Sequence, residues 1–197
     1  MSSEPSVRQR TNGHLLFAQQ FLRHPLQIGS IIPSSSFLER RVIAAADLAS
    51  AGVVVELGAG TGGMTRAMLR VLPPGARLLS IEINPRFHAQ VSRIEDARLI
   101  AHLGSAADLG RIAALRGLTA PDAIVSGIPF STMSEAIGAR IVAEVAAILA
   151  DAGRFVAYQF SPRVSTLTEP LLGSPEVGME LINFPPMRVF RWAKPKA

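Results

Sequence analysis

Two acidic residues beside a group of glycines are the side chains whose types and spacing best suit ligand binding. Glu56 stands just before Gly58, Gly60, Gly62 and Gly63, and Glu82 ends the next apolar run of the chain. Glycines let a backbone approach a ligand closely, and a helix that follows them points its first N–H groups at the ligand. Carboxylates that accept hydrogen bonds from hydroxyl groups, next to such a turn, indicate a nucleoside ligand.

The elements that must position these residues form an alternating series. The run that begins at Val53 is apolar enough for a strand buried on both faces, and a helical pattern follows the glycines. Strand and helix then alternate as far as Phe160, which predicts a doubly wound α/β domain. The expected strands are 53–57, 77–83, 98–103, 122–128 and 153–160, with helices at 37–49, 64–72, 85–94, 107–115 and 134–150. Two further strands, 179–184 and 189–192, predict an antiparallel hairpin that ends a mostly parallel seven-stranded sheet.

The first 36 residues differ from this domain. Residues 1–13 are polar and without a period, and we expect them to be disordered. Residues 14–36 are expected to form an amphipathic helix, ended by Pro25, and an apolar entry segment, before the main domain at 37–197. The apolar stripe of that helix suits either the core of the protein or a membrane interface, and its spacing does not separate the two.

Composition sets broad limits on the class of protein. The chain has 197 residues, 48% hydrophobic content and no cysteine, which fits one domain with a full core and excludes disulfides and thiolate metal sites. The first residues lack the apolar core of a signal peptide, and no stretch of about 20 residues is apolar enough to span a bilayer. The net charge of +5 suits either phosphate-bearing partners or ordinary solubility.

Three sequence motifs resemble those of Rossmann-like S-adenosylmethionine-dependent methyltransferases. They are residues 56–62 with the sequence ELGAGTG, 80–85 with SIEINP, and 102–109 with HLGSAADL. The resemblance implies that the glycines hold the methionine and ribose parts of the cofactor, that Glu56 lies near its ammonium group, and that Glu82 binds both ribose hydroxyls. The remaining cofactor contacts that it implies are Gly58, Ala59, Gly60, Gly62, Ile83, Ser105, Ala106 and Ser126.

A dinucleotide-binding enzyme is the alternative interpretation of this glycine turn. Its glycines are spaced G-x-G-x-x-G, and a catalytic domain accompanies the binding fold. Here Gly58, Gly60, Gly62 and Gly63 have another spacing, and no segment of the chain suits a separate catalytic domain. Methyl transfer is therefore the favoured chemistry.

The sequence after the fourth strand bears on the methyl acceptor. Ser126-Gly127-Ile128-Pro129-Phe130 is similar to the Asn-Ile/Leu-Pro-Tyr/Phe motif of ribosomal RNA adenine dimethylases, with Gly127 in place of the asparagine. The Ser-Gly-Ile/Leu-Pro form instead resembles bacterial phospholipid N-methyltransferases, as does the segment Arg23–Ser35. The resemblance implies methylation of phosphatidylethanolamine and its mono- and dimethyl forms toward phosphatidylcholine.

The implied reaction suggests roles for further residues. Backbone carbonyls of Ser126 and Gly127 would orient the amine, and the Tyr158 hydroxyl would accept a hydrogen bond from it or relay its proton. Aromatic faces suit a methylated, cationic amine, and an arginine suits a lipid phosphate. The substrate-binding residues expected are Phe17, Phe21, Ser34, Ser35, Pro129, Phe130 and Arg163.

A lipid substrate also requires contact with a membrane. The helix at 14–24, with arginines nearby, would lie on anionic lipid and cover the cofactor, which places the protein at the cytoplasmic face of the inner membrane. We expect no metal, no nucleic acid partner and no obligate protein partner. Two alternatives stay open: methylation of RNA or a small amine at the same site, and an inactive membrane-binding protein with this fold.

Overall fold

The computed structural model describes residues 35–181 and 186–196 of the chain. The expected disordered segment 1–13 and nearly all of the segment 14–36 lie outside these residues. The predictions for Phe17, Phe21 and Ser34 lie outside them as well.

A single seven-stranded sheet forms the centre of the described part of the chain, and its strand order is β3-β2-β1-β4-β5-β7-β6. Strands β1 to β5 are parallel, whereas β7 is antiparallel to both β5 and β6. This arrangement confirms the predicted doubly wound sheet that ends in an antiparallel hairpin. The strands are β1 (Val53–Leu57), β2 (Arg77–Glu82), β3 (Leu99–Leu103), β4 (Ala123–Ser126), β5 (Arg154–Gln159), β6 (Glu176–Glu180) and β7 (Met187–Ala193).

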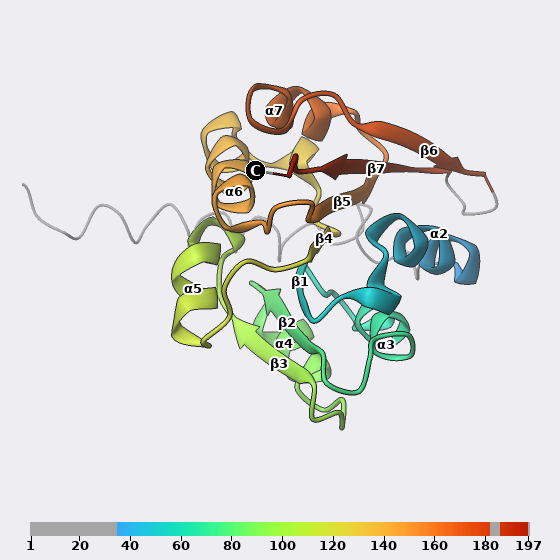
Figure 1. Cartoon of the computed structure of the whole chain (residues 1–197), viewed down its shortest axis with the longest axis vertical. Coiled ribbons are helices and arrows are strands. Elements are labelled where there is room, and N and C mark those ends of the chain that lie inside the picture. Colours follow the sequence, from blue (N-terminus) through green and yellow to red (C-terminus); the bar gives the residue numbers. More distant parts are fainter. Residues whose placement is uncertain (1–34, 182–185, 197) are drawn as a thin grey trace, which may run out of the picture.

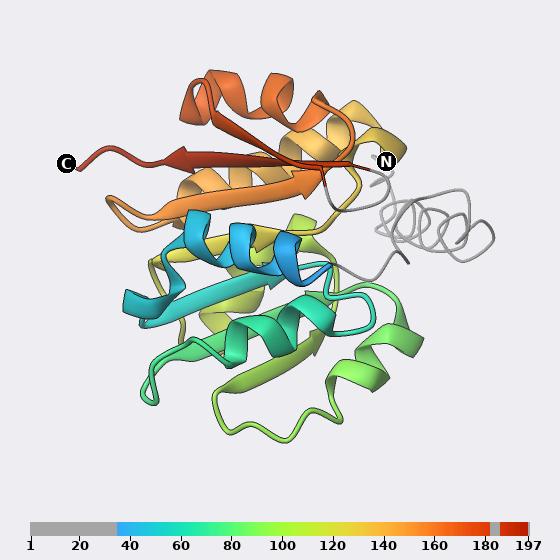
Figure 2. The same ribbon diagram turned by 90° about the vertical axis from the view of Figure 1, so that its right-hand side faces the viewer.

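Helices cover both faces of this sheet (Figure 1). One face carries α2 (Ser36–Ala46), α3 (Gly63–Leu69) and α4 (Pro85–Val91), and the other carries α5 (Leu109–Leu115), α6 (Glu135–Ile148) and α7 (Arg163–Leu172). Three short 3-10 helices complete the description: η2 (Leu48–Ser50), η3 (Ala106–Asp108) and η4 (Phe130–Thr132). The parallel strands end at one common edge of the sheet, which we call the carboxyl edge (Figure 2).

Two apolar cores lie on the two faces of the sheet. The core under α2 and α3 contains Val42, Met68 and Val125, all fully buried. The core under α5, α6 and α7 contains the aromatic stack of Phe155, Trp192 and Phe190, with ring centroids 5.1 and 6.0 Å apart along the stack. The Trp192 Nε1 group donates a hydrogen bond of 3.0 Å to the carbonyl of Gly173, which fixes the end of α7 to β7.

Several helices end two or three residues earlier than predicted, and two elements differ more from the prediction. Strand β6 is Glu176–Glu180 rather than 179–184, because this edge strand leaves Val177 and Met179 exposed and so lacks the usual alternation of buried apolar residues. Helix α7 was not predicted. It contains Pro170 and buries only Val164 and Thr168, so its sequence carries a weak helical stripe.

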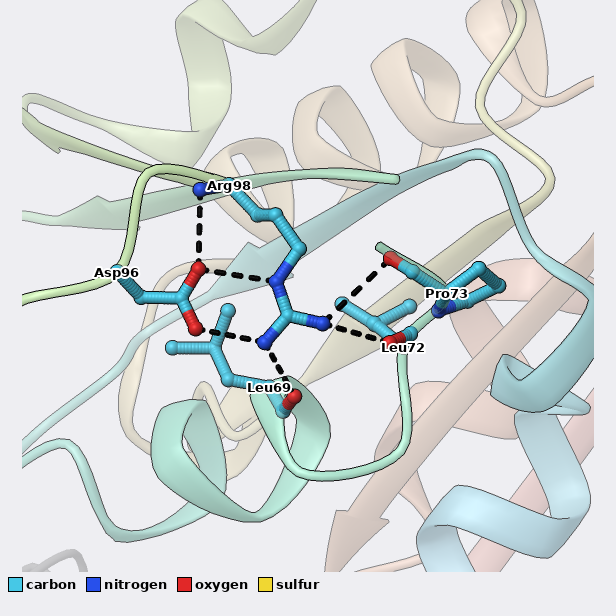
Figure 3. A network of polar contacts seen from close by, with 5 residues as sticks. All are labelled: Leu69, Leu72, Pro73, Asp96 and Arg98. Carbon is cyan, nitrogen blue, oxygen red and sulfur yellow. Dashed lines mark hydrogen bonds and ion pairs between the residues drawn. The ribbon is translucent and has the colours of Figure 1, made fainter. Parts of the chain in front are cut away.

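The far end of α3 is fixed by one arginine (Figure 3). The Arg98 guanidinium donates hydrogen bonds of 2.6 Å to the carbonyls of Leu69 and Leu72, and it pairs with the Asp96 carboxylate, also at 2.6 Å. These carbonyls belong to the end of α3 and the turn after it, where helical partners are missing. Arg98 therefore links the helix after the glycine turn to the start of β3.

Candidate active site

The site lies where the order of the sheet reverses, between β1 and β4. These two parallel strands are neighbours, with Leu57 opposite Ser126, but the chain leaves them toward helices on opposite faces. Ligands of doubly wound sheets bind at the carboxyl edge at such a point. The glycine turn follows β1 at this edge, and the Ser126-Gly127 segment ends β4 beside it.

The glycine turn needs glycine for its backbone conformation. Gly58, Gly60 and Gly62 have φ values of 81°, 54° and 81°, in the left-handed region. The turn is held in place because the Gly58 N–H donates a hydrogen bond of 2.9 Å to the Ile81 carbonyl, and because Gly62 is the N-cap of α3. A Cβ atom on Gly58 would lie 3.1 Å from the Ile128 side chain, so the turn also contacts the segment after β4.

Glu56 lies beneath this turn and is 1% exposed. Its Oε2 atom accepts hydrogen bonds from the Thr65 hydroxyl at 2.6 Å and the Ser80 hydroxyl at 2.7 Å. Its Oε1 atom is buried and has no hydrogen-bond partner among residues 35–181 and 186–196. Burial raises the pKa of Glu56 to about 7, and the nearby Glu82 contributes to the rise. A buried carboxylate oxygen without a partner suits a cationic group of a ligand.

Glu82 connects the glycine turn to the end of β2. Its Oε2 atom accepts a hydrogen bond of 2.8 Å from Gly60 N–H, and its Oε1 atom accepts one of 2.8 Å from Asn84 N–H. Burial raises the pKa of this carboxyl, although the two N–H groups act in the opposite direction. Ile83, which follows it, is half-buried. The predicted ligands Glu56 and Glu82 are therefore brought together with the glycine turn.

The segment after β3 completes the carboxyl edge beside β2. Ser105 caps η3, and its hydroxyl accepts a hydrogen bond of 3.2 Å from Ala107 N–H. Ala106 and Ala107 are buried. Because Leu103 pairs with Glu82 in the sheet, Ser105 follows β3 at the same edge.

The three residues predicted to be catalytic also come together. Ser126 is fully buried, and its hydroxyl accepts a hydrogen bond of 3.3 Å from Ile128 N–H, which shapes the turn after β4. The Gly127 N–H donates a hydrogen bond of 2.9 Å to the Leu57 carbonyl. Tyr158 is half-buried on β5, and a Cβ atom on Gly127 would lie 2.5 Å from the Tyr158 hydroxyl oxygen. Burial, followed by the charges of the nearby glutamates, raises the pKa of Tyr158.

The residues predicted to bind the substrate are more scattered. Phe130 is fully buried in the core with α6, where a Cβ atom on Gly138 would lie 3.6 Å from its ring. This placement argues against its predicted role as an aromatic face for a methylated amine. Ser35 caps α2 by accepting from Leu38 N–H at 3.2 Å, and Arg163 is a half-buried residue at the start of α7. Pro129 is half-buried beside η4.

Sequence reasoning missed several polar residues of the site. Thr65 and Ser80 hold Glu56, and Asn84 binds Glu82 through its backbone while its side chain caps α4. The Asn84-Pro85 pair is a recognisable helix start and was the available signal. Gln159 is 5% exposed at the end of β5, and within the described part of the chain neither the oxygen nor the nitrogen of its side-chain amide has a hydrogen-bond partner.

Solved structures share this fold at low sequence identity. The N-methyltransferase NodS from Bradyrhizobium japonicum, in complex with S-adenosyl-L-homocysteine, has a TM-score of 0.68 at 13% identity, covering 91% of this chain and 99% of its own. A Burkholderia thailandensis 1,6-didemethyltoxoflavin-N1-methyltransferase with bound S-adenosylhomocysteine has a TM-score of 0.65 at 14% identity, covering 100% and 94%. This likeness shows that the chain has the Rossmann-like fold of these methyltransferases.

Sequence relatives narrow this class. No family model matches the chain. An ornithine lipid N-methyltransferase from Singulisphaera acidiphila is 33% identical over 143 residues, which cover 71% of this chain and 74% of the relative. The chain belongs to the family of this lipid N-methyltransferase. A ribosomal RNA small subunit methyltransferase A from Phenylobacterium zucineum is 30% identical over 130 residues, covering 64% of this chain but only 41% of that relative.

Proposed function

We propose that the chain methylates the amine of a lipid headgroup, with phosphatidylethanolamine and its mono- and dimethyl forms as substrates and phosphatidylcholine as the end product. The similarity to an ornithine lipid N-methyltransferase across most of both chains carries this proposal. Ornithine and ethanolamine headgroups both present a primary amine on a flexible chain next to an anionic group. The same site geometry therefore suits either lipid.

The residues at the carboxyl edge fit the cofactor. The unpartnered Oε1 atom of Glu56 suits the ammonium group of the methionine part, and ionisation of this carboxyl is favoured once a cation lies against it. Glu82 would accept hydrogen bonds from the ribose hydroxyls, and Ser105 and Ala106 would lie beside the adenine. When bound there, S-adenosylmethionine supplies an electrophilic methyl group on a sulfonium.

The protein must present the lipid amine in its neutral form. An amine with an ordinary pKa of about 10.4 costs roughly 4 to 5 kcal/mol to deprotonate at pH 7. Burial at the Gly127 turn lowers this cost, because a low-dielectric site disfavours the ammonium form. The carbonyls of Ser126 and Gly127, at the end of β4, are acceptors that orient the lone pair. Arg163, at the start of α7, would bind the anionic group of the same headgroup.

Contact with anionic lipid is part of the proposal, at the cytoplasmic face of the inner membrane. Phe37, in the first turn of α2, is 42% exposed, and the Arg40 guanidinium lies 4.7 Å from its ring centroid. Leu181, which follows β6 at the carboxyl edge, is 69% exposed. An exposed aromatic and a leucine beside arginines suit the boundary between headgroups and acyl chains. None of the helices in residues 35–181 and 186–196 has the length and apolar character needed to cross a bilayer.

The test is a methyl-transfer assay with labelled S-adenosylmethionine and the full-length chain. Vesicles of phosphatidylethanolamine, vesicles that contain ornithine lipid, and RNA are supplied separately, and the lipid and RNA fractions are then extracted. We expect label in the phosphatidylethanolamine fraction, and much less label there with a Glu82→Gln variant at the same S-adenosylmethionine concentration. Label in ornithine lipid alone corrects the headgroup, whereas label in RNA alone refutes the lipid proposal.

RNA methylation is the second candidate, because several ribosomal RNA methyltransferases are 30% to 34% identical to parts of this chain. The chain spans less than half the length of these relatives.

Absence of label from lipid and RNA alike, together with intact vesicle binding, is the result expected for an inactive membrane-binding protein. Flotation with anionic and with neutral vesicles measures that binding directly.

A further inference from the structure

Position 127 has no room for a side chain. A Cβ atom there would lie 2.5 Å from the Tyr158 hydroxyl oxygen, 2.9 Å from Cζ of the same ring, and 3.1 Å from the Gly58 carbonyl oxygen. Real Cβ atoms essentially never lie within 3.0 Å of another heavy atom. The φ angle of Gly127 is outside the left-handed region, unlike that of Gly58. Glycine is therefore required at this position because Tyr158 fills the space of a side chain, and not because residue 127 has a backbone conformation that only glycine adopts readily.

The sheet places Tyr158 at this point. Ser126 pairs with Ala157 across β4 and β5, so the next residues of the two strands, Gly127 and Tyr158, lie side by side at the carboxyl edge. The Tyr158 ring packs against the core under α2 and α3, on the face of the sheet where Glu56 meets Thr65 of α3. A ring held by this packing cannot swing away without opening the core. Its hydroxyl therefore stays over Gly127.

The Tyr158 hydroxyl is available to a ligand. It makes no hydrogen bond to any other described residue, and its oxygen lies between the glycine turn and the segment after β4. A phenol has one donor and an oxygen that also accepts. Because its pKa is raised, the group stays protonated at neutral pH and cannot act as a general base. Such a hydroxyl can accept a hydrogen bond from an amine N–H without taking its proton.

We propose that Gly127 and Tyr158 act as a matched pair, in which the missing side chain at 127 admits the Tyr158 hydroxyl, and this hydroxyl orients the methyl-accepting amine. This inference rests on the proposed function for the identity of the amine. The nitrogen lone pair forms the new bond to the methyl carbon as the carbon–sulfur bond breaks toward sulfur. The positive charge passes from the sulfonium to the product nitrogen, and a remaining N–H of that nitrogen loses its proton to solvent before the next transfer. Tyr158 accepts an N–H hydrogen bond from the primary and the secondary amine and takes no proton; the tertiary amine of a third transfer has no N–H, so this contact acts on the first two transfers.

The first test isolates the hydroxyl. Tyr158→Phe keeps the ring and removes one oxygen, so we expect melting temperature and S-adenosylhomocysteine affinity to match the wild type. The methylation rate at saturating lipid should fall at least tenfold. An unchanged rate overturns the proposed role of the hydroxyl. The variant is compared with the wild type on whichever acceptor the wild type methylates, so a wrong lipid assignment does not affect this comparison.

The second test measures the steric pairing and needs no substrate. Gly127→Ala should lower the melting temperature by about 3 to 10 °C, as overpacking does in a domain of this size. In a Tyr158→Val background, where the hydroxyl and ring are gone, the same change should cost less than half as much. Gly75→Ala is the matched control, because nothing lies within 4 Å of a Cβ atom there. Equal costs in the two backgrounds overturn the pairing.

Discussion

Replacement of Glu56 by glutamine should remove a pH dependence from the stability of the ligand-free protein. Burial raises the pKa of Glu56 from 4.5 to about 7, because the hydrogen bonds from Thr65 and Ser80 only partly offset the loss of solvent. Between these two pH values the folded protein holds a proton that the unfolded chain has released. Stability is therefore highest below pH 4.5 and is lost as the pH rises through about 7.

The magnitude follows from the two pKa values. A rise from 4.5 to about 7 corresponds to about 3 kcal/mol of free energy of unfolding lost above pH 7. Glutamine does not titrate, so the variant lacks this loss. Glu82, whose pKa is also raised, acts in the same direction, while His102, whose pKa is lowered, acts in the opposite one. Both groups are present in the wild type and the variant, so the difference between the two proteins reports Glu56.

The assay is urea unfolding at pH 5, 6, 7 and 8, followed by the fluorescence of Trp192. This is the one tryptophan of the sequence, and its side chain is buried. The free energy of unfolding of Glu56→Gln, relative to that of the wild type, should rise by about 2 to 3 kcal/mol from pH 5 to pH 8, because a part of the effect is already lost at pH 5. Glu95→Gln, at an exposed position, should follow the wild type. Parallel curves for wild type and Glu56→Gln would show that Glu56 does not have this pKa in the folded protein.

Three further predictions concern the site and its supports. Glu82→Gln should weaken S-adenosylhomocysteine binding about 10- to 100-fold in calorimetry, because charge-assisted hydrogen bonds are lost; unchanged affinity contradicts the assigned role. Arg98→Met should lower the free energy of unfolding by about 2 kcal/mol, since two carbonyls lose donors at 2.6 Å. The exposed Arg70→Met should cost less than about 1 kcal/mol, and equal losses in the two variants count against the Arg98 assignment. Gly153→Ala should lower the free energy of unfolding in urea by about 1 to 3 kcal/mol, because its Cβ atom would lie 2.7 Å from the Ala150 carbonyl oxygen. A loss below about 0.5 kcal/mol would show that the turn makes room for the Cβ atom without overpacking.

The sequence predicted the parallel strands and the site edge because their signals are local. Each buried strand reads as a short apolar run, and Glu56 and Glu82 are adjacent to the ends of two such runs. Since β1 and β2 are neighbours in the sheet, this local information was enough to bring the two carboxyl groups to one edge.

What the sequence did not predict depends on packing between distant segments. Thr65 reaches Glu56 from a helix and Ser80 reaches it from the next strand, which requires the helix rotation and the strand register together. The same is true of Phe130, whose motif suggests a ligand contact but whose ring turns into the core under α6. Likewise, the contact of Tyr158 with Gly127 follows from the pairing of β4 with β5, 31 residues apart in the chain.

The Arg98 clamp also bears on how the structure opens locally. One side chain binds the end of α3, the following turn and Asp96, so these segments cannot separate without breaking all of its hydrogen bonds at once. We therefore expect their amide protons to exchange with solvent as one cooperative unit and to be protected together. Edge strand β6, with Val177 and Met179 exposed, should exchange sooner. Motion at the cofactor site is thereby confined to the glycine end of α3, while its far end stays anchored.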